Sequence, residues 1–538
     1  MKKEEKLLEE LGKIDEDLIP EVLGKSDEAE SVSKQSDVIV DCSKKMGKKK
    51  RVNYRAIWIS VGAVAAAAVL AIILVPKLFK SKDDGSITAG GVISSDENVT
   101  SSDVENTTAG MATSSETVYE PNRMAAPAYP YMPSFPDEAT YNQEDYNRQY
   151  NEWKDAVHNL RAQQSGYMDG YREYCQKVIS SVFANVGQNK NRVFSPLSLY
   201  MALAMTAEVS DGATRQQILD VLCQPDIENS RAHANALWLV NYMDDGLATL
   251  ILGDSLWLNT NRQYNQELFE VLAEEYFASC YSGDPASDSY NQAFRRWINT
   301  QTGNLLEDFA SQLSFDPDMT MYLVSTVYYC AKWSTKFKEK DTKPDTFHAA
   351  GGDVTCDFMY SDSPWMTYYG ENFECVFIST EHNGTMRFIL PNEGITPEEL
   401  MQDEEFMEFM TAKKWDKYHS YDGGIHLYVP KFDICTDMDL TGYLTSLGIT
   451  DAFDPGQADF SPLTKDSAGM CISSLEQDTR LLIDEEGCKA ASVTVVLIGA
   501  GDANPVREFR LDRPFIFEIV SEMDVPLFIG VVNDPTAG

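Results

Sequence analysis

Histidine and cysteine carry the widest range of chemistry in this chain, but neither falls at a spacing that builds a reactive site. The 538 residues include six histidines and ten cysteines. No HExxH, no paired CxxC, no GxSxG turn and no phosphate-binding Walker loop occurs among them. We therefore expect no catalytic residue, no metal ion and no cofactor. The histidines are His158, His233, His348, His382, His419 and His426.

The cysteines do not indicate a disulfide framework. Cys42 precedes an apolar segment described below, and the nine that remain are an odd number, so they cannot all pair with one another. Buried cysteines that pack as small apolar side chains are the simpler interpretation.

The charge of the chain excludes one class of partner. There are 45 Lys and Arg residues against 84 Asp and Glu residues, which leaves a formal net charge of -39. Such a chain repels phosphate backbones instead of releasing their counterions, so nucleic acid is excluded as a partner.

One segment near the N-terminus is apolar enough to cross a membrane. Residues 56–75 read AIWISVGAVAAAAVLAIILV, without a charge, and as a helix they span about 30 Å, the thickness of a bilayer core. A cleaved signal peptide is the alternative, but such peptides have a shorter apolar core and fewer residues before it. Basic residues are more numerous before the segment than after it, which favours a cytoplasmic N-terminus. We predict a charged cytoplasmic head (1–54), a transmembrane helix (55–76) and an extracellular remainder.

Residues 77–165 are predicted to be an extracellular flexible linker. As far as about residue 140 the segment is rich in Ser, Thr, Asp, Asn, Ala and Pro, too polar to bury a core. Apolar residues then recur at helical spacing, which predicts a short amphipathic helix at the end of the linker. These residues are Tyr146, Tyr150, Trp153, Val157 and Leu160.

From residue 166 to residue 538 the pattern is that of a large globular domain. Helical stretches such as LYMALAMTAEV mix with strand-like runs such as RFILP and FIFEIV, without strict alternation. This order is typical of an α+β fold and not of a doubly wound sheet.

Several blocks of this region resemble the serpin family of serine protease inhibitors, in the order in which serpins carry them. Residues 191–222 (NRVFSPLSLYMALAMTAEVSDGATRQQILDVL) resemble the N-terminal signature, and residues 509–519 (FRLDRPFIFEI) resemble the C-terminal one. The resemblance implies a serpin-like α+β fold with a large central β-sheet, additional sheets, about eight or nine helices and an exposed reactive loop. With the transmembrane helix in front, the chain resembles a membrane-anchored, bacterial-type member. The other matching blocks are 297–309, 323–347, 429–434 and 444–463.

Residues 483–509 lie where serpins carry their hinge and reactive loop. In that family a protease cuts the loop, the loop inserts into the main sheet as a new strand, and the protease stays trapped as an acyl ester. A strand has a period of two, so one set of alternate residues must tolerate the core. If Cys488 faces inward, so do five other uncharged residues, while Lys489 faces outward. The hinge and inserting residues are Glu486, Gly487, Cys488, Lys489, Ala490, Ala491, Ser492, Val493 and Thr494, and the further inward positions are Val496 and Ile498.

The serpin spacing from Gly487 places the reactive bond between Gly501 and Asp502. Because the loop is about two residues longer than is typical of the family, Ala500 and Ala503 are alternatives. Small residues at the bond favour elastase-like or subtilisin-like serine proteases as targets, with cysteine proteases as an alternative. No Arg or Lys precedes the bond, which disfavours trypsin-like targets.

The resemblance also implies a region where the sheet opens, and the chain departs from the family there. Ser325 and Gln477 stand where serpins usually have Asn and His, although both side chains can still form hydrogen bonds. Cys488 replaces a usual hydroxyl residue and Lys489 a usual acidic one, so we expect slower insertion. The implied sheet-opening residues are Ser195, Ser198, Ser325, Trp333 and Gln477.

The leading hypothesis is a membrane-tethered suicide inhibitor of serine proteases, on the outer face of the cell membrane. The alternative is a non-inhibitory serpin that acts as an extracellular binding or signalling module. The acidic stretch EELGKIDEDL resembles the cytoplasmic heads of some membrane regulators, which suggests a cytoplasmic partner for residues 1–54.

Overall fold

The computed structural model describes residues 119–138, 142–184, 190–363, 365–382, 384–412, 414–421, 424–473, 475–488 and 507–537. The predicted head (1–54) and transmembrane helix (55–76) lie outside these residues. Across the described ranges, no helix is both long enough and apolar enough to cross a membrane. The chain from Thr113 to Gly538 forms one compact unit.

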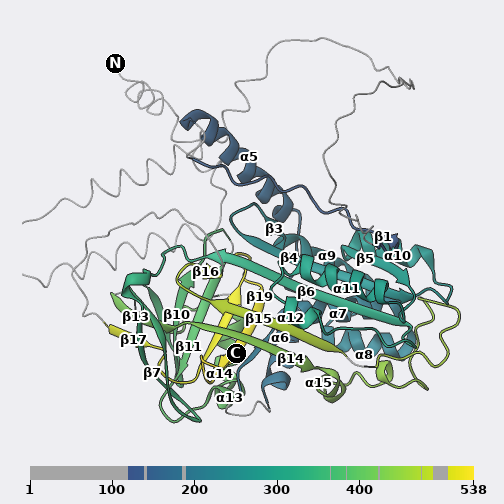
Figure 1. Ribbon diagram of the computed structural model, residues 1–538. Coiled ribbons are helices and arrows are strands. Elements are labelled where there is room, and N and C mark those ends of the chain that lie inside the picture. The colour runs from purple at the N-terminus through teal and green to yellow at the C-terminus, as the bar shows by residue number, and fades with distance from the viewer. Residues whose placement is uncertain are drawn as a thin grey trace, which may run out of the picture. The chain divides into compact units, whose positions relative to one another are not determined.

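The described chain is an α+β structure, as the sequence predicts, and it contains four sheets (Figure 1). The largest core lies between these sheets and the helices packed on them. One sheet runs β1 (Asn122–Ala125), β5 (Ala278–Gly283), β4 (Thr249–Asn259), β6 (Met321–Lys332) and β16 (Gly487–Cys488), with β3 (Met243–Asp244) also on β4. A second sheet runs β12 (His419–Tyr421), β9 (Met366–Tyr369), β10 (Phe373–Ser379), β11 (Thr385–Pro391), β18 (Phe515–Val520), β19 (Pro526–Val532) and β2 (Arg192–Phe194). A third runs β17 (Arg507–Arg510), β13 (Ile425–Pro430), β8 (Gly352–Ser363) and β7 (Lys343–Ala349), and β14 (Phe432–Asp439) pairs with β15 (Glu476–Ile483).

The described residues form eleven α-helices, more than the eight or nine that the sequence predicts. One of them, α5, precedes the domain predicted over 166–538, and two others are single turns of four residues. The helices are α5 (Gln143–Ala162), α6 (Tyr171–Phe183), α7 (Pro196–Val209), α8 (Gly212–Leu222), α9 (Ile227–Asn241), α10 (Gln266–Glu275), α11 (Asp288–Gln301), α12 (Glu307–Ala310), α13 (Pro397–Leu400), α14 (Glu404–Thr411) and α15 (Thr441–Ser446).

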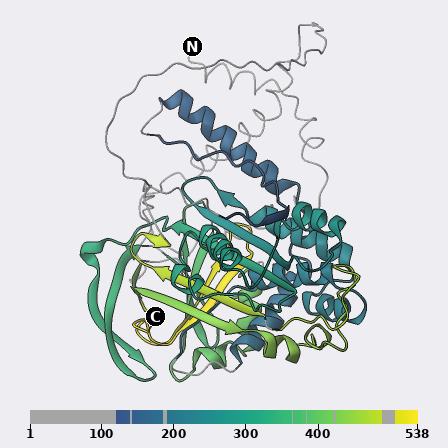
Figure 2. The same ribbon diagram turned by 45° about the vertical axis from the view of Figure 1, so that its right-hand side comes forward.

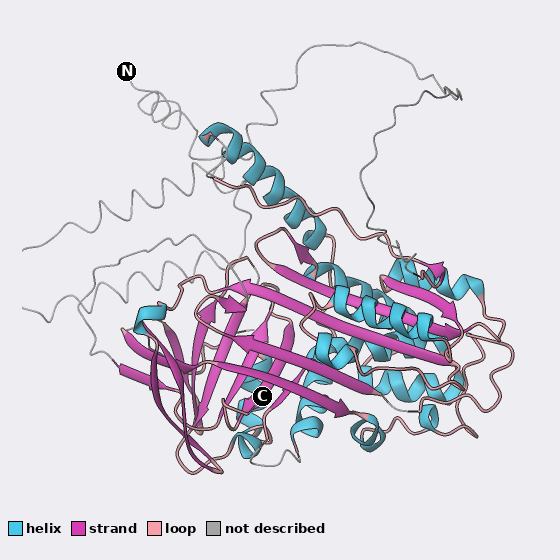
Figure 3. Cartoon of the chain, viewed as in Figure 1, coloured by secondary structure: helices cyan, strands magenta, loops and turns pink. Residues whose placement is uncertain are grey.

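Helices cover both faces of the sheet that contains β4 and β6 (Figure 3). Helix α11 packs on one face, where Phe294 and Ile298 join a separate apolar cluster around Trp257. Helix α7 packs on the other face and is buried along its whole length. Its start is specified locally, because Pro196 stands in the first turn and the Ser195 side chain accepts a hydrogen bond from a free backbone N–H.

Strands β6 and β15 are neighbours that are not paired with each other. The free edge of β6 pairs only with the two residues of β16 at its end, and β15 pairs only with β14, among the residues that the structure describes. The main sheet is therefore divided into two parts. This division positions the candidate site.

The segment predicted to be a flexible linker is ordered over its described part, so that prediction is wrong there. Residues Asn122–Ala125 pair with β5 and extend the main sheet by one strand. The predicted amphipathic helix exists as α5, and Trp153 and Val157 are its buried apolar residues. We call residues 122–162, within the described ranges, the strap; Figure 2 shows it on the outside of the domain.

Side-chain contacts hold the strap to the domain. Tyr129 packs against Trp238, Tyr242 and Phe277, with ring centroids 5.1, 5.9 and 6.3 Å away. At the other end of the strap, Arg161 forms an ion pair with Glu522. Composition alone predicts a linker here, because these contacts depend on a few residues in a segment of low apolar content.

Candidate functional site

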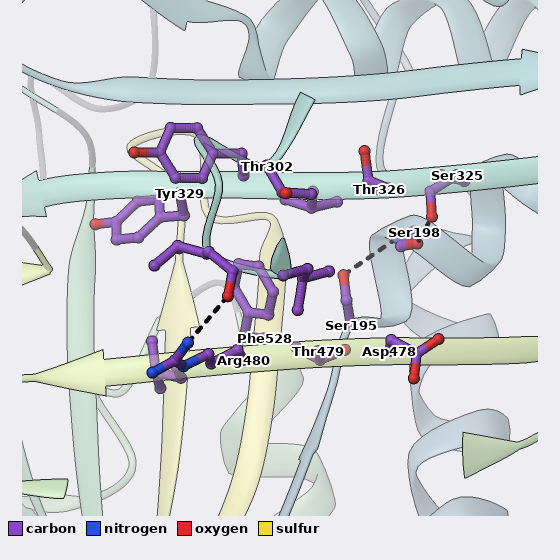
Figure 4. Close-up of a pocket in the computed structure, with 15 residues that line it drawn as sticks. Ser195, Ser198, Thr302, Ser325, Thr326, Tyr329, Asp478, Thr479, Arg480 and Phe528 are labelled. Carbon is purple, nitrogen blue, oxygen red and sulfur yellow. Dashed lines mark hydrogen bonds between the residues drawn. The ribbon is translucent and has the colours of Figure 1, made fainter. Parts of the chain in front are cut away.

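The candidate site is the gap between β6 and β15. Figure 4 shows the two strands running in the same direction, one carrying Ser325, Thr326 and Tyr329 and the other carrying residues 478–480. The gap contains a slot of about 40 Å³ in its middle and a cavity of about 400 Å³ towards the start of β6. Among the described residues, β16 is the one strand that pairs with β6 on this side, and none pairs with β15 there, so the gap is shaped to receive an extended segment.

The start of helix α7 holds both sides of the gap. On the β15 side, the Gln477 amide spans the Ser195 backbone: the Ser195 N–H donates to Gln477 Oε1 at 2.8 Å, and Gln477 Nε2 donates to the Ser195 carbonyl at 2.9 Å. On the β6 side, Ser198 Oγ donates to the Ser325 carbonyl at 2.9 Å. The two strands that an inserting segment would separate are thus tied to one helix end.

A short connection after α11 crosses the gap. Arg480 of β15 donates to the Leu305 carbonyl at 3.1 Å and also pairs with Asp433 at 2.7 Å. On the other side, Gly303 lies so close to Tyr328 of β6 that a Cβ atom there would stand 2.6 Å from the tyrosine ring. Insertion of a strand along the whole gap requires this connection to move.

The hinge lies at the other end of the gap, where β6 ends. Trp333 is fully buried, its backbone N–H donates to the Glu486 carbonyl at 3.2 Å, and its indole N–H donates to the Asp484 carbonyl at 2.8 Å. Lys336 pairs with the Glu486 carboxylate at 2.5 Å. These contacts anchor the chain at the point from which the loop departs.

Gly487 is required at the hinge by its conformation and by its surroundings. Its φ of 127° lies in a region that L side chains rarely adopt, and an added Cβ would stand 2.6 Å from the Ala331 carbonyl oxygen. Gly487 and Cys488 already pair with Lys332 and Ala331 of β6, antiparallel. The first two residues of a strand in the gap are therefore in place.

Comparison with known proteins decides the family. The family model described as Serpin (serine protease inhibitor) matches residues 170–535. The chain belongs to the serpin family.

Relatives of this serpin occur in distant organisms. It is 27% identical to Serpin-Z10 of Arabidopsis thaliana over 388 residues, which cover 69% of this chain and 98% of the relative. It is 29% identical to alpha-1-antiproteinase of Rattus norvegicus, over 64% of this chain and 84% of the relative. Among solved structures, the thermophilic serpin tengpin in its native state is 26% identical and superposes with a TM-score of 0.60, over 68% of this chain and 94% of tengpin. Serpins are protease inhibitors and not enzymes.

Two carboxyl groups of this serpin have raised pKa values, one on β15 at the edge of the gap and one on β4, the strand that pairs with β6 on the side away from the gap. Burial raises the pKa of Asp254 on β4 to about 8, and the neighbouring Ser325 hydroxyl offsets part of that rise. Burial, followed by the charges of Asp437 and Glu476, raises the pKa of Asp478 on β15 to about 8. Both carboxyl groups are hence largely protonated at neutral pH.

The structure brings together four of the five residues that the serpin resemblance assigns to sheet opening. Ser195, Ser198, Ser325 and Gln477 lie at the middle of the gap, on both of its sides. Trp333 lies apart from them, at the hinge. The backbone at Glu486, Gly487 and Cys488 is described, and the remaining predicted loop residues lie outside the described ranges: Lys489, Ala490, Ala491, Ser492, Val493, Thr494, Ala500, Gly501, Asp502 and Ala503.

Sequence reasoning missed Asp254. A single Asp in the strand TLILGDSLWLN has no motif around it, and an acidic residue is by default read as exposed. Apolar residues on both sides at strand spacing were the available signal, because they place this Asp on the buried face.

No metal site emerges from the described residues, where no group of three or more His, Cys, Asp and Glu side chains could hold an ion. None of the cysteines whose side chains are described forms a disulfide: Cys175, Cys223, Cys280, Cys330, Cys356, Cys375, Cys435 and Cys471.

Proposed function

We propose that this serpin is a membrane-tethered suicide inhibitor of serine proteases with elastase-like or subtilisin-like specificity. The observation that carries the proposal is the match in length and pattern between β6 and the loop that follows the hinge. Membership of the family supports protease binding but does not separate inhibitory from non-inhibitory members. The match with β6 is specific to the loop of this chain and supports inhibition.

The pairing register at the hinge shows how many loop residues could pair with β6. Gly487 pairs with Lys332 and Cys488 with Ala331, antiparallel. If the loop continues in this register, Lys489 pairs with Cys330 and Ile498 with Met321, which is the first residue of β6. The length of β6 beyond its pairing with β16 thus accommodates residues 489–498, and the GAG sequence that starts at Gly499 follows directly after it.

The two faces of an inserted strand would also fit their surroundings. Cross-strand partners share a face of the sheet, so Ala490 would lie beside Tyr329 and Ser492 beside Val327, both of which contribute to the main core. Lys489 would lie on the opposite face, beside Cys330. No charged side chain would enter the core.

The chemistry of trapping belongs to the protease. Its serine Oγ attacks the carbonyl carbon of Gly501, the bond to the Asp502 nitrogen breaks, and the new amino terminus leaves as an ester forms between the serine and Gly501. Insertion of residues 489–498 then carries the bound protease along the gap before water hydrolyses the ester. Ala500 and Ala503 are the alternative residues at the bond, and cysteine proteases would form the analogous thioester.

The tether is a second part of the proposal. The uncharged residues 56–75 support a membrane span with the serpin domain outside the cell, and the acidic head supports a cytoplasmic partner for residues 1–54. Alkaline extraction of membranes tests the span: the full chain should stay in the pellet, and the same chain without residues 56–75 should be released. Release of both would overturn the tether.

The test of inhibition uses the full chain in detergent, mixed with pancreatic-type elastase or with subtilisin. We expect a complex that survives a denaturing gel, with a cut between Ile498 and Asn504 located by mass spectrometry. A Thr494→Arg variant is the control, because a charge on the inward face blocks insertion and should convert the inhibitor into a substrate.

The same gel separates the proposal from its alternative. Cleavage of the wild-type loop without a complex, and without a gain in stability of the cleaved chain, would favour the non-inhibitory binding or signalling module. The unusual Cys488 and Lys489 at the hinge are the sequence features that would then account for the failure.

A further inference from the structure

Strand β17 is the first described element after the loop, and it lies at the edge of its sheet. Its four residues pair in parallel with residues 425–428 of β13, and no described strand pairs with it on the other side. Of its side chains, Phe509 is buried. A strand this short and paired on one side has few backbone contacts, so its side chains decide how firmly it is held. The inference below rests on the proposed function, because it concerns what releases the loop for insertion.

Arg507 connects β17 to a neighbouring sheet. Its Nη1 donates to the Tyr369 hydroxyl at 3.0 Å, and its guanidinium carbon lies 5.4 Å from the centroid of the Tyr369 ring and 4.4 Å from that of Tyr421. Tyr369 ends β9 and Tyr421 ends β12, the two strands at one edge of the second sheet. Guanidinium groups stack on aromatic faces, so these three side chains form a cation–π contact between the two sheets. We call them the clamp.

Arg510 holds the opposite face of the same strand. Successive residues of a strand alternate between faces, so Arg507 and Arg510 point in opposite directions. Arg510 stacks on Tyr428 of β13, with 4.2 Å from its guanidinium carbon to the ring centroid, and pairs with Asp345 of β7. These partners belong to the sheet of β17, whereas the partners of Arg507 belong to its neighbour.

An uncut loop cannot insert fully while β17 stays in its sheet. In the proposed register Ile498 reaches the start of β6, and the nine steps from there to Arg507 extend to about 32 Å at most. Strand β6 measures about 36 Å between its ends, Met321 and Lys332. Figure 1 shows β17 on the same side of the domain as β16, with β6 running away from that side. The uncut chain is therefore too short to reach back, and full insertion requires either a cut or the release of β17.

We propose that Arg507 is a positioning residue that keeps β17 in its sheet and so makes insertion depend on cleavage. While the clamp holds, an uncut loop cannot enter the gap over its full length. A cut separates the loop from β17, so the clamp then no longer opposes insertion. The clamp thus acts on the uncut chain.

The test follows the uncut full chain in detergent, held a few degrees below its unfolding temperature. Guanidinium unfolding of timed samples measures the fraction with a raised midpoint, and mass spectrometry shows that the loop is intact. We expect Arg507→Ala to convert to this form roughly tenfold faster than the wild type, because release of β17 then breaks no cation–π contact. Glu508→Ala, at the exposed neighbour on the same strand, is the matched control and should convert at the wild-type rate.

Two comparisons separate this role from a general loss of stability. Freshly purified Arg507→Ala should trap subtilisin at the wild-type stoichiometry, because the cut itself frees the loop from β17. In the Arg507→Ala background, Tyr421→Leu should have little further effect on the rate of conversion, because its partner in the clamp is already missing.

The outcomes distinguish the clamp from the proposed function. Additive effects in the double variant, or conversion of Arg507→Ala no faster than that of the wild type or of Glu508→Ala, would overturn the clamp. A wild-type midpoint that does not rise after the loop is cut would instead reject insertion itself, and with it the proposed function.

Discussion

Gly487 is the residue at which the sheet and the loop meet, and its backbone leaves no room for a side chain. We expect Gly487→Ala to destabilise the native form by at least about 2 kcal/mol, because alanine would be strained at this φ and would press on the Ala331 carbonyl. Thermal unfolding measures the effect. Gly442→Ala is the matched control, since its helical position is open and its φ is ordinary; an equal loss in both variants would contradict the argument.

The carboxyl groups of Asp254 and Asp478 predict how stability depends on pH. Each has a pKa of about 8 in the folded chain against an ordinary value of 3.8, so each binds its proton more tightly when folded. Each group therefore makes its full contribution to the free energy of unfolding below its pKa in the unfolded chain. That contribution is lost as the pH rises from there through the pKa in the folded chain.

Urea unfolding midpoints between about pH 5 and about pH 8 should decline with rising pH. The slope should be shallower in Asp254→Asn, because one of the carboxyl groups with a raised pKa is then removed. An unchanged slope in that variant would show that Asp254 does not titrate in this range.

At the scale of elements, the strap is the part of the fold that contributes an additional strand. Tyr129 and Tyr131 are two residues apart, but Tyr129 packs against three aromatic rings and Tyr131 is 85% exposed. We expect Tyr129→Ala to lower the free energy of unfolding by on the order of 2 kcal/mol and Tyr131→Ala to change it little. Equal effects in thermal unfolding would mean that the strap does not pack on the domain.

The same element shows where prediction from sequence stops. The residues of β1, NRMA, contain no β-branched or aromatic side chain, so their pairing depends on the edge of β5 and not on their own preference for strand. Helix α5 could be predicted, because Tyr150, Trp153 and Val157 recur at helical spacing along its length. The partner of each element became visible only in three dimensions.

At the scale of the whole molecule, the folded unit is larger than the serpin signature. A chain that starts at residue 166 lacks β1 and α5, whereas one that starts at residue 119 keeps both. We expect the longer chain to unfold at a temperature several degrees higher in a side-by-side thermal scan. Identical unfolding temperatures would show that the strap does not stabilise the domain.

The ordered blocks of the sequence predicted the α+β class and the serpin fold, because each block corresponds to a strand or helix that packs in the same place. Ser195 and Gln477, which are far apart in the sequence, lie 2.8 Å apart as N and Oε1 on the β15 side of the gap. The division of the main sheet could not be predicted in the same way. Whether β6 and β15 pair depends on long-range packing, and their own residues are compatible with either arrangement.

The edges of β6 and β15 that face the gap have one more consequence. Strand edges that face a gap are usually protected by charge, proline or a covering loop, but if the gap admits the chain's own loop, as proposed, it cannot be closed in these ways. A strand from a second copy would satisfy the same backbone groups, and linking such copies head to tail would form an open chain of molecules. This contact becomes more frequent as the concentration of the protein rises, so self-association sets an upper limit on the concentration at which single molecules persist.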